Sequence, residues 1–234
     1  MPDSEAESDS RAAIMTSLPV YTVILLVSIA AVMAAQLYRG LEPSILAAGF
    51  VKPDFIFAHE YWRILTGAVL HGSLLHVAMN GYALFSFGRL FEMLSSRSHL
   101  AIVFLASAIG GGLLSLAFSP DGISVGASGG IVGLISYLAV YAFRRRRFIS
   151  AEFRKNLLIN IGFILVFGLV LYQIVDNYGH IGALITGAVY GFIQIPSDEY
   201  VDPRKASAVV EVLGLIALGT YIAASLFSIF LMLR

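Results

Sequence analysis

Long runs of uncharged, apolar residues alternate with short polar segments along most of this chain. A helix needs about 20 such residues to cross the hydrocarbon core of a bilayer. Counted in this way, the sequence predicts seven membrane spans, at residues 18–38, 74–93, 100–118, 128–143, 157–174, 180–195 and 212–233. The fourth of them is short for a complete crossing. The pattern therefore predicts an all-α polytopic membrane protein.

Two segments depart from this pattern. Residues 39–73 are too polar to cross a bilayer and too rich in aromatic side chains to be a plain linker. Residues 1–17 contain several acidic residues and serines, which predicts a short disordered tail. Because that tail is acidic where a signal or transit peptide would be basic, we expect the first span to be retained.

The composition supports a membrane environment and excludes several classes of protein. Apolar residues make up 58% of the chain and charged residues 13%, against roughly 45–50% and 25% in soluble domains. Fifteen basic residues balance fifteen acidic ones, so no nucleic-acid or other polyanionic partner is expected. The absence of cysteine from the sequence excludes disulfides, thiolate metal sites and cysteine nucleophiles.

Basic residues predict the orientation, because lysine and arginine near span ends stay on the cytoplasmic side. Four consecutive arginines, residues 144–147, lie between the fourth and fifth spans. Alternation of the spans leaves only Arg39, Lys52, Arg63 and Arg234 on the opposite side. We therefore expect a cytoplasmic N-terminus and an external C-terminus, in a plasma (inner) cell membrane.

Several polar residues lie inside predicted spans, where each one needs a partner or a role. His76 and Asn80 are four residues apart in the second span and so share one helix face. Ser128 opens the fourth span within Gly126-Ala127-Ser128-Gly129, and His180 opens the sixth. The predicted topology puts all four polar side chains near the external membrane face.

These residue types can support nucleophilic catalysis. A serine flanked by glycines has an exposed backbone N–H and room for another backbone to approach. The imidazole of His180 can take the serine hydroxyl proton and so activate Ser128. The Ser128 N–H, the Asn80 amide and a His76 ring nitrogen can then stabilise a tetrahedral oxyanion. A dyad of this kind needs no acidic third member.

Structural readings stay open for each residue taken alone. Ser128 can be a small residue that lets helices pack closely, and the His76–Asn80 pair can be an interhelical hydrogen bond. His180, beside Asn177, can be a buried histidine with satisfied hydrogen bonds. We expect two further histidines, His59 and His99, to be solvated in loops. The coincidence of the candidate groups on one membrane side favours catalysis.

Together these residues resemble the rhomboid family of intramembrane serine proteases, over a core from about Tyr61 to Gly187. The Gly126-Ala127-Ser128-Gly129 segment resembles the family's G-x-S-G motif, which implies that Ser128 is the nucleophile. His180 resembles the general base, and His76 with Asn80 resembles the H-x-x-x-N pattern that serves the oxyanion. The resemblance implies no cofactor and no metal.

Supporting motifs extend the resemblance. His71 matches a further histidine with a structural role, and Trp62-Arg63 matches a pair in the first external loop. Gly88-x-x-x-Glu92 matches a structural glutamate that accepts hydrogen bonds at the cytoplasmic end. The implied organisation is a cytoplasmic tail (residues 1–17), a rhomboid-like six-helix catalytic core (18–196), and a cytoplasmic loop with one C-terminal transmembrane helix (197–234).

The sequence also departs from the family pattern. Val132 stands where some members have a tyrosine stacked on the catalytic histidine, so what orients the His180 ring is open, with Asn177 or Tyr178 as contributors. The small-residue face of the sixth span reads Ala183-x-x-x-Gly187, where some members have glycine first. Asp176 suggests a catalytic triad, but the resemblance implies a dyad.

The implied activity is hydrolysis of peptide bonds in or next to transmembrane segments of other membrane proteins, within the lipid bilayer. The resemblance also implies that the fifth span, with Phe163, Phe167 and Tyr172, forms a lateral gate for substrates. A zinc protease is disfavoured because His59-Glu60-Tyr61-Trp62-Arg63 ends in arginine. An aspartyl protease lacks its second aspartate, and a transporter lacks paired discontinuous helices. A catalytically inactive, client-binding relative remains the alternative, and the oligomeric state stays open.

Overall fold

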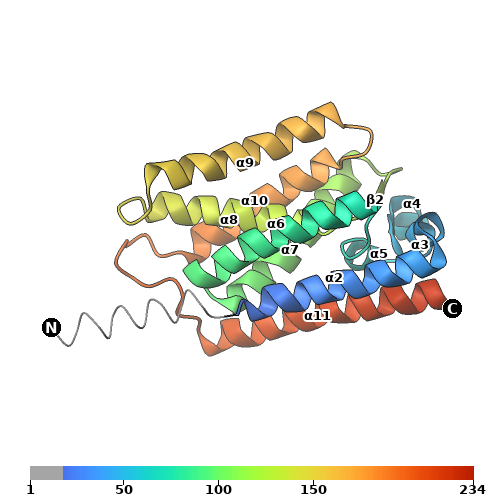
Figure 1. Cartoon of the computed structure of the whole chain (residues 1–234), viewed down its shortest axis with the longest axis horizontal. Helices are drawn as coiled ribbons and strands as arrows, with labels where there is room; N and C mark the ends of the chain where they lie inside the picture. Colours follow the sequence, from blue (N-terminus) through green and yellow to red (C-terminus); the bar gives the residue numbers. More distant parts are fainter. Residues whose placement is uncertain (1–17) are drawn as a thin grey trace.

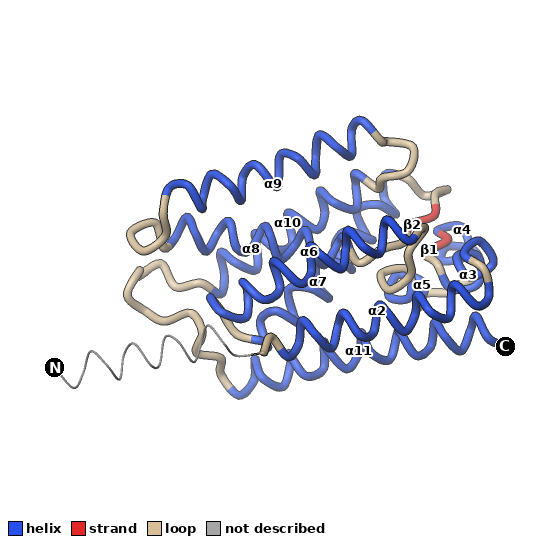
Figure 2. The backbone as a smooth tube through the Cα atoms, in the orientation of Figure 1, coloured by secondary structure: helices blue, strands red, loops and turns tan. Residues whose placement is uncertain are grey.

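The structure, a computed structural model, describes residues 18–234 and is almost entirely helical (Figures 1 and 2). The predicted tail of residues 1–17 lies outside the described residues. The helices are α2 (Val20–Arg39), α3 (Leu41–Ala48), α4 (Lys52–Phe57), α5 (Arg63–Thr66), α6 (Leu74–Leu94), α7 (Arg97–Phe118), α8 (Ser128–Arg144), α9 (Ala151–Val170), α10 (Asn177–Gln194) and α11 (Ala208–Leu233). Two short strands, β1 (Phe50–Val51) and β2 (Ile123–Ser124), complete the fold.

Every predicted span falls on a helix, but the helices are not equally suited to lipid. In the described part of the chain, four helices are long and apolar enough to cross a membrane, namely α2, α7, α9 and α11. Helix α8 is apolar but shorter, as its sequence predicted. Helices α6 and α10 fall outside this set, and the polar residues that they carry include His76, Asn80 and His180.

Serine hydroxyls explain where several helices begin. The backbone N–H groups in the first turn of a helix have no acceptor within the helix. A side-chain oxygen just before the helix can accept a hydrogen bond from the N–H three residues later. Four helices start in this way, at Ser73, Ser96, Ser150 and Ser207. These caps set the helix ends independently of the apolar runs.

The fifth span was predicted in the wrong place for this reason. Its helix, α9, begins at Ala151 and ends at Val170, whereas the apolar run suggested residues 157–174. The N–H of Phe153 donates to the hydroxyl of Ser150 at 3.1 Å, so the helix includes a charged first turn that the apolar count left out. Tyr172, expected on the gate helix, lies instead in the turn that follows it.

His99 is a second correction. It was expected to be solvated in a loop, but it lies in the first turn of α7 and is 2% exposed. The cap at Ser96 starts α7 before the apolar run, and the Nδ1 atom of His99 lies 2.7 Å from the hydroxyl of Tyr190 on α10. His59 is exposed, as expected.

Helices α7, α8 and α10 form the centre of the bundle (Figure 1). Gly187 of α10 meets the backbone of Gly133 on α8 so closely that a Cβ atom would not fit between them. Ala183, one turn earlier, is fully buried. The small-residue face of α10 is therefore its packing face, which holds His180 at a fixed distance from α8.

The remaining long helices surround this centre unequally. Helix α9 lies along one edge of the bundle (Figure 1), and only Leu157 and Gly168 of it are buried. Helix α11 packs beside α2 and against α7. The hydroxyl of Tyr221 on α11 donates to the carbonyl of Ala68 at 3.3 Å, which links the seventh helix to the segment before α6.

Residues 39–73, the polar and aromatic-rich segment between the first two predicted spans, form a compact unit at one end of the bundle. It contains α3, β1, α4 and α5, and β1 pairs antiparallel with β2 through Phe50↔Ser124 and Val51↔Ile123 (Figure 2). The N–H of Gly126 also donates to the carbonyl of Gly67 at 3.0 Å. These bonds attach the segment to the turn that leads into α8.

Candidate active site

Ser128 and His180 meet across two helices. Ser128 is the first residue of α8, and His180 lies in the first turn of α10. The Nε2 atom of His180 is 3.0 Å from the Oγ atom of Ser128. When Nε2 carries no proton, the hydroxyl donates to it, which is the arrangement that a general base and a nucleophile require.

The start of α8 supplies free backbone donors beside this pair. The first four N–H groups of a helix have no partner within the helix, and no side chain caps α8 within the described chain. Ser128, Gly129 and Gly130 therefore present their N–H groups where a developing negative charge would be stabilised. Gly129 also packs on α7, where its Cβ position lies 3.4 Å from the Cα atom of Ala108.

His76 and Asn80 face the turn that precedes Ser128. Gly126 has φ +128°, and a Cβ atom there would lie 2.9 Å from Nε2 of His76 and 3.5 Å from Nδ2 of Asn80. Glycine is needed at this turn for both its positive φ and the close approach. The Nδ2 atom of Asn80 is buried and has no hydrogen-bond partner in residues 18–234, so this donor is free to bind another group.

Local hydrogen bonds hold both the backbone and the ring of His76. The hydroxyl of Ser73 accepts a hydrogen bond from the backbone N–H of His76 at 3.1 Å and caps α6. The N–H of Gly72 donates to Nδ1 of His76 through a long bond of 3.4 Å. A neutral ring that accepts at Nδ1 carries its proton on Nε2, the atom that faces Gly126. His76 thus presents a second donor beside that of Asn80.

His71 packs behind His76 and does not reach Ser128. Its ring is fully buried and lies edge-on to the His76 ring, with 5.0 Å between centroids. Burial, assisted by the neighbouring His76, lowers the pKa of His71 to about 3, so the ring is neutral at physiological pH. Both of its ring nitrogens lack hydrogen-bond partners in the described chain. Its contacts are those of a packing residue.

The backbone of His71 is held by Gln36, a residue that the sequence reading missed. Gln36 lies in α2, is fully buried, and was counted as part of an uncharged apolar run. Its amide nitrogen donates to the His71 carbonyl, and its amide oxygen accepts from the His71 N–H, both at 3.0 Å. The signal available in the sequence was an amide side chain inside a span, which calls for a partner.

Arg63 organises residues 39–73, which we call the first-loop segment, without touching the reacting pair. Its guanidinium is paired with Glu60 at 2.5 Å and Asp54 at 3.0 Å, and it also donates to the carbonyls of Leu46 and Gly49. A buried arginine is stable only when its donors are satisfied in this way. Arg63 therefore ties α3, α4 and α5 together beside the site.

Trp62 connects this segment to the seventh helix. Its indole stacks under the Arg63 guanidinium at 4.8 Å and meets Phe227 of α11 edge-to-face, with 5.4 Å between ring centroids. The expected Trp-Arg pair is thus part of the packing that positions the loop over the helices.

Glu92 lies at the other end of the bundle, away from Ser128. Its carboxylate accepts from both the N–H and the hydroxyl of Thr22 in the first turn of α2, at 2.8 and 2.7 Å. Gly88 lies directly against the same threonine, where a Cβ atom would be 2.6 Å from its hydroxyl oxygen. The G-x-x-x-E spacing therefore makes one docking site for the start of α2.

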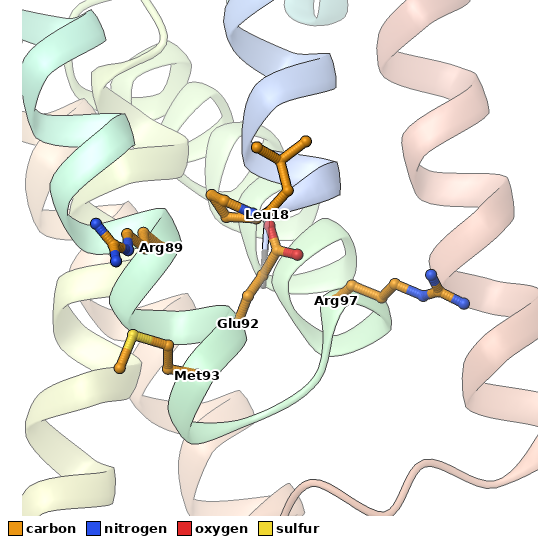
Figure 3. A pocket seen from close by; sticks show the side chains of 6 residues that line it. Leu18, Arg89, Glu92, Met93 and Arg97 are labelled. Atoms are coloured by element: carbon orange, nitrogen blue, oxygen red, sulfur yellow. The ribbon is translucent and has the colours of Figure 1, made fainter. Parts of the chain in front are cut away.

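A cavity of about 140 Å³ adjoins Glu92. Figure 3 shows Glu92 extending toward the start of α2, between Arg89 and Arg97. Leu18, Pro19 and Met93 complete the lining. This cavity holds neither Ser128 nor His180, so it belongs to a separate part of the molecule.

A second cavity, of about 60 Å³, contains the Ser128–His180 pair. A volume of this size can hold a few water molecules. It lies between the first-loop segment and helices α7, α8 and α10, and its lining includes Gly67, Gly112, Gly126, Ser128, Asp176 and His180. The reacting groups thus face a small hollow and are not sealed in the core.

Asn177 and Tyr178, the two residues expected to contribute to the orientation of the His180 ring, make their contacts with other helices. Asn177 donates to the carbonyl of Gly168 at 3.0 Å and links α10 to α9, and Tyr178 stacks on Phe118 of α7. No side-chain hydrogen bond joins Asp176 to the His180 ring in the described structure, which disfavours a triad. Nδ1 of His180 is buried without a partner in the same residues.

A metal site is not evident in the described residues either. No group of three or more histidine, aspartate or glutamate side chains gathers there in a way that could hold an ion. The chemistry that the site offers is that of its own hydroxyl, imidazoles and amide donors.

Comparison with known proteins identifies the family. The model of the Rhomboid domain matches residues 58–197. Rhomboid protease GluP of Bacillus subtilis (strain 168) is 36% identical over 144 residues, which cover 62% of this chain and 28% of that protein. RHOMBOID-like protein 6, mitochondrial, of Arabidopsis thaliana is 33% identical over 153 residues, or 64% of this chain and 49% of that protein.

Inactive rhomboid protein 1 of Papio anubis is also similar, with 28% identity over 149 residues, which cover 63% of this chain and 17% of that protein. The chain spans about half the length of these relatives, or less. The resemblance drawn from the residues is confirmed at the level of the family. Since the family model covers more than half of the chain, and four of its described helices suit a bilayer, this is a multi-pass membrane protein of the rhomboid family.

Proposed function

We propose that this protein is an intramembrane serine protease that hydrolyses peptide bonds in or next to transmembrane segments of other membrane proteins. The observation that carries the proposal is the 3.0 Å hydrogen bond between Nε2 of His180 and Oγ of Ser128, inside a cavity. Donors from two helices lie near this pair: the N–H groups at the start of α8, and His76 and Asn80 of α6, which face the turn at Gly126. A structural serine or histidine would not need a free amide donor, such as that of Asn80, beside it.

The reaction follows from these positions. His180 takes the hydroxyl proton while Oγ of Ser128 attacks the carbonyl carbon of the scissile bond. The carbonyl oxygen becomes an oxyanion and accepts from the amide of Asn80, Nε2 of His76 and the N–H of Ser128, each typically worth ~3 kcal/mol. The protonated His180 then gives its proton to the leaving amine, and an acyl-enzyme remains on Ser128.

Water completes the cycle from the cavity. His180 takes a proton from a water molecule, the resulting hydroxide attacks the acyl carbon, and the serine leaves with the proton returned by His180. The products are a new carboxylate end and a new amine end of the substrate chain. The cavity has room for the water that this second step consumes.

The proposed substrates are transmembrane proteins whose helices unwind readily near the membrane face. A helical segment hides its carbonyls in hydrogen bonds, so the bond must become extended before Ser128 can attack it. We propose lateral entry beside α9, which has only two buried residues and carries Phe163 and Phe167 stacked on each other. A helix with few buried contacts can move at low energetic expense.

The proposed arrangement in the membrane has seven spans, with the N-terminus cytoplasmic and the C-terminus external, in the plasma (inner) membrane of a cell. The arginine cluster at residues 144–147 supports this orientation. This orientation would put Ser128 and His180 near the external face, and Glu92 near the cytoplasmic face.

The alternative is a catalytically inactive, client-binding protein. One of the relatives carries the name inactive rhomboid protein 1. The Ser128–His180 hydrogen bond favours the protease, because a client-binding protein has no need to keep both groups in contact.

Purified protein in proteoliposomes tests the proposal with a transmembrane reporter substrate. The wild type should release two fragments, and Ser128→Ala and His180→Ala should release none. Ser28→Ala, on α2, whose hydroxyl donates to the Ile24 carbonyl of its own helix at 2.9 Å, is the matched control and should retain cleavage. Labelling with a fluorophosphonate should disappear in Ser128→Ala and persist in the control. Equal cleavage by the wild type and Ser128→Ala would refute the protease.

A further inference from the structure

The carboxylate of Asp176 lies at the junction of three elements. Its Oδ2 atom accepts from the hydroxyls of Ser115 on α7 and Ser124 on β2, both at 2.5 Å. Its Oδ1 atom accepts from the N–H of Gly179 at 2.8 Å and so caps α10. A carboxylate that accepts three hydrogen bonds holds its neighbours more firmly than a neutral acceptor does.

Lys52 supplies the counter-charge from a fourth element. It belongs to α4, is 2% exposed, and its Nζ atom lies beside Gly122, 3.2 Å from where a Cβ atom would be. Burial lowers the pKa of Lys52, while the charge of Asp176 opposes that shift. Burial raises the pKa of Asp176, but the hydroxyls, the Gly179 N–H and Lys52 together bring it below its ordinary value. Asp176 is therefore ionised at neutral pH.

The hydrogen bonds of this carboxylate connect the two segments that precede the reacting groups. Ser124 precedes Ser128 by four residues, and Asp176 precedes His180 by four residues. The carbonyl of Asp176 also accepts from the N–H of His180 at 3.0 Å. One side chain thus links the segment that leads into the nucleophile to the segment that leads into the base.

The His180 ring lacks other means of orientation. Its Nδ1 atom has no hydrogen-bond partner in residues 18–234, and the structure gives it no stacked aromatic ring, since position 132 is a buried valine. Apart from the contact of Nε2 with Ser128, the ring is placed by the path of α10. The start of that path is the cap at Asp176.

We propose that Asp176 is a positioning residue, whose carboxylate sets the placement of His180 against Ser128 by holding β2, α7 and the start of α10 together. The inference rests on the proposed protease function. It differs from a catalytic triad, because the Asp176 carboxylate makes no hydrogen bond to the His180 ring and acts through the backbone. A misplacement of about 1 Å at a reacting pair can lower the rate roughly 100-fold, so small movements of β2 or α10 suffice.

The test compares variants that remove the charge, the cap or one link. Asp176→Asn keeps a good cap but loses the charge, and Asp176→Ala loses both. Ser124→Ala removes only the link to the nucleophile side. We expect kcat to fall on the order of 100-fold in Asp176→Ala and about 10-fold in Ser124→Ala, with KM within about two-fold of the wild type. Asp176→Asn should retain more activity than Asp176→Ala.

A control separates positioning from general stability. Ser207→Ala removes the same kind of cap from α11, whose serine accepts from the N–H of Val210 at 3.3 Å. It should lower the melting temperature and leave the kcat of the folded protein unchanged. If Asp176→Ala fails to fold, Ser124→Ala and Asp176→Asn still carry the comparison.

The outcomes distinguish the two proposals. Wild-type kcat in Ser124→Ala and in either Asp176 variant would overturn the positioning role and leave the protease intact. The same holds if kcat falls only in proportion to the folded fraction, or if KM alone rises. A wild-type protein that neither cleaves the reporter nor is labelled at Ser128 would overturn the protease itself, and the positioning role with it.

Discussion

The side-chain amide of Gln36 on α2 makes two hydrogen bonds to the backbone of His71, one to its carbonyl and one from its N–H. This pairing joins the first helix to the turn that starts α6, two residues before Ser73 caps that helix. Since α6 carries His76 and Asn80, the first helix helps to define the side of the site where the oxyanion would form.

Gln36→Leu should therefore lower both stability and turnover. It leaves two buried backbone groups of His71 unsatisfied, at about 1–3 kcal/mol each. Thermal unfolding in detergent, followed by circular dichroism, measures the first effect, and reporter cleavage by the folded fraction measures the second. Gln173→Leu, at an exposed glutamine after α9, is the matched control and should change neither. A Gln36 variant as stable as the wild type would contradict the structural role.

Asn80→Ala is expected to affect catalysis alone. Its Nδ2 donor has no partner in the described structure of the free protein, so its removal breaks no existing hydrogen bond. If it binds the oxyanion, turnover should fall roughly 10- to 1,000-fold while the melting temperature stays within a degree or rises. Asn160→Ala, on α9, provides the comparison. Unchanged turnover would remove Asn80 from the site.

Gly126→Ala should disturb the turn before the nucleophile. The backbone there has φ +128°, and the added methyl group would meet the His76 ring at 2.8 Å. The strain is worth on the order of 1–3 kcal/mol, and labelling of Ser128 by fluorophosphonate should be lost. Gly162→Ala, on α9, meets nothing within 4 Å in the described residues and should stabilise by up to about 1 kcal/mol. Full labelling in Gly126→Ala would show that the turn tolerates a side chain.

His71 should make stability depend on pH. In the unfolded chain it binds a proton below about pH 6.5, whereas the folded protein keeps it neutral down to about pH 3. The unfolded state therefore gains protons first, and stability falls as pH drops from 6.5 toward 3, by at most ~1.4 kcal/mol per pH unit. Above pH 6.5 the His71 ring is neutral in both states, so it adds no further pH dependence to the stability.

Melting temperatures of the wild type and His71→Phe between pH 7 and 4 measure this dependence. The variant should show a shallower decline, because phenylalanine preserves the ring packing on His76 and does not titrate. His59→Phe, at an exposed histidine, should keep the wild-type slope. Identical slopes for the wild type and His71→Phe would indicate that the buried ring is protonated without unfolding.

The incorrect predictions for α9, His99 and Asp176 have a common physical origin. The apolar count misplaced α9 because a cap at Ser150 overrides hydropathy at the helix start. It treated His99 as a solvated loop residue because nothing nearby in the sequence reveals Tyr190, its partner 91 residues away. Asp176 was weighed only as a triad member, since the two serines it binds belong to other segments.

The sequence by itself determined the bilayer as solvent, the approximate positions of the long helices other than α9, the His76–Asn80 face and the motifs that identify the family, because hydropathy and helical periodicity act over a few residues. Only the tertiary structure decided that His180 lies within hydrogen-bond distance of Ser128, 52 residues apart in the chain. It also decided that Gln36 holds His71 and that Asp176 joins β2 to α10. Such contacts depend on how closely separate helices pack, which side-chain volumes of the whole bundle set together.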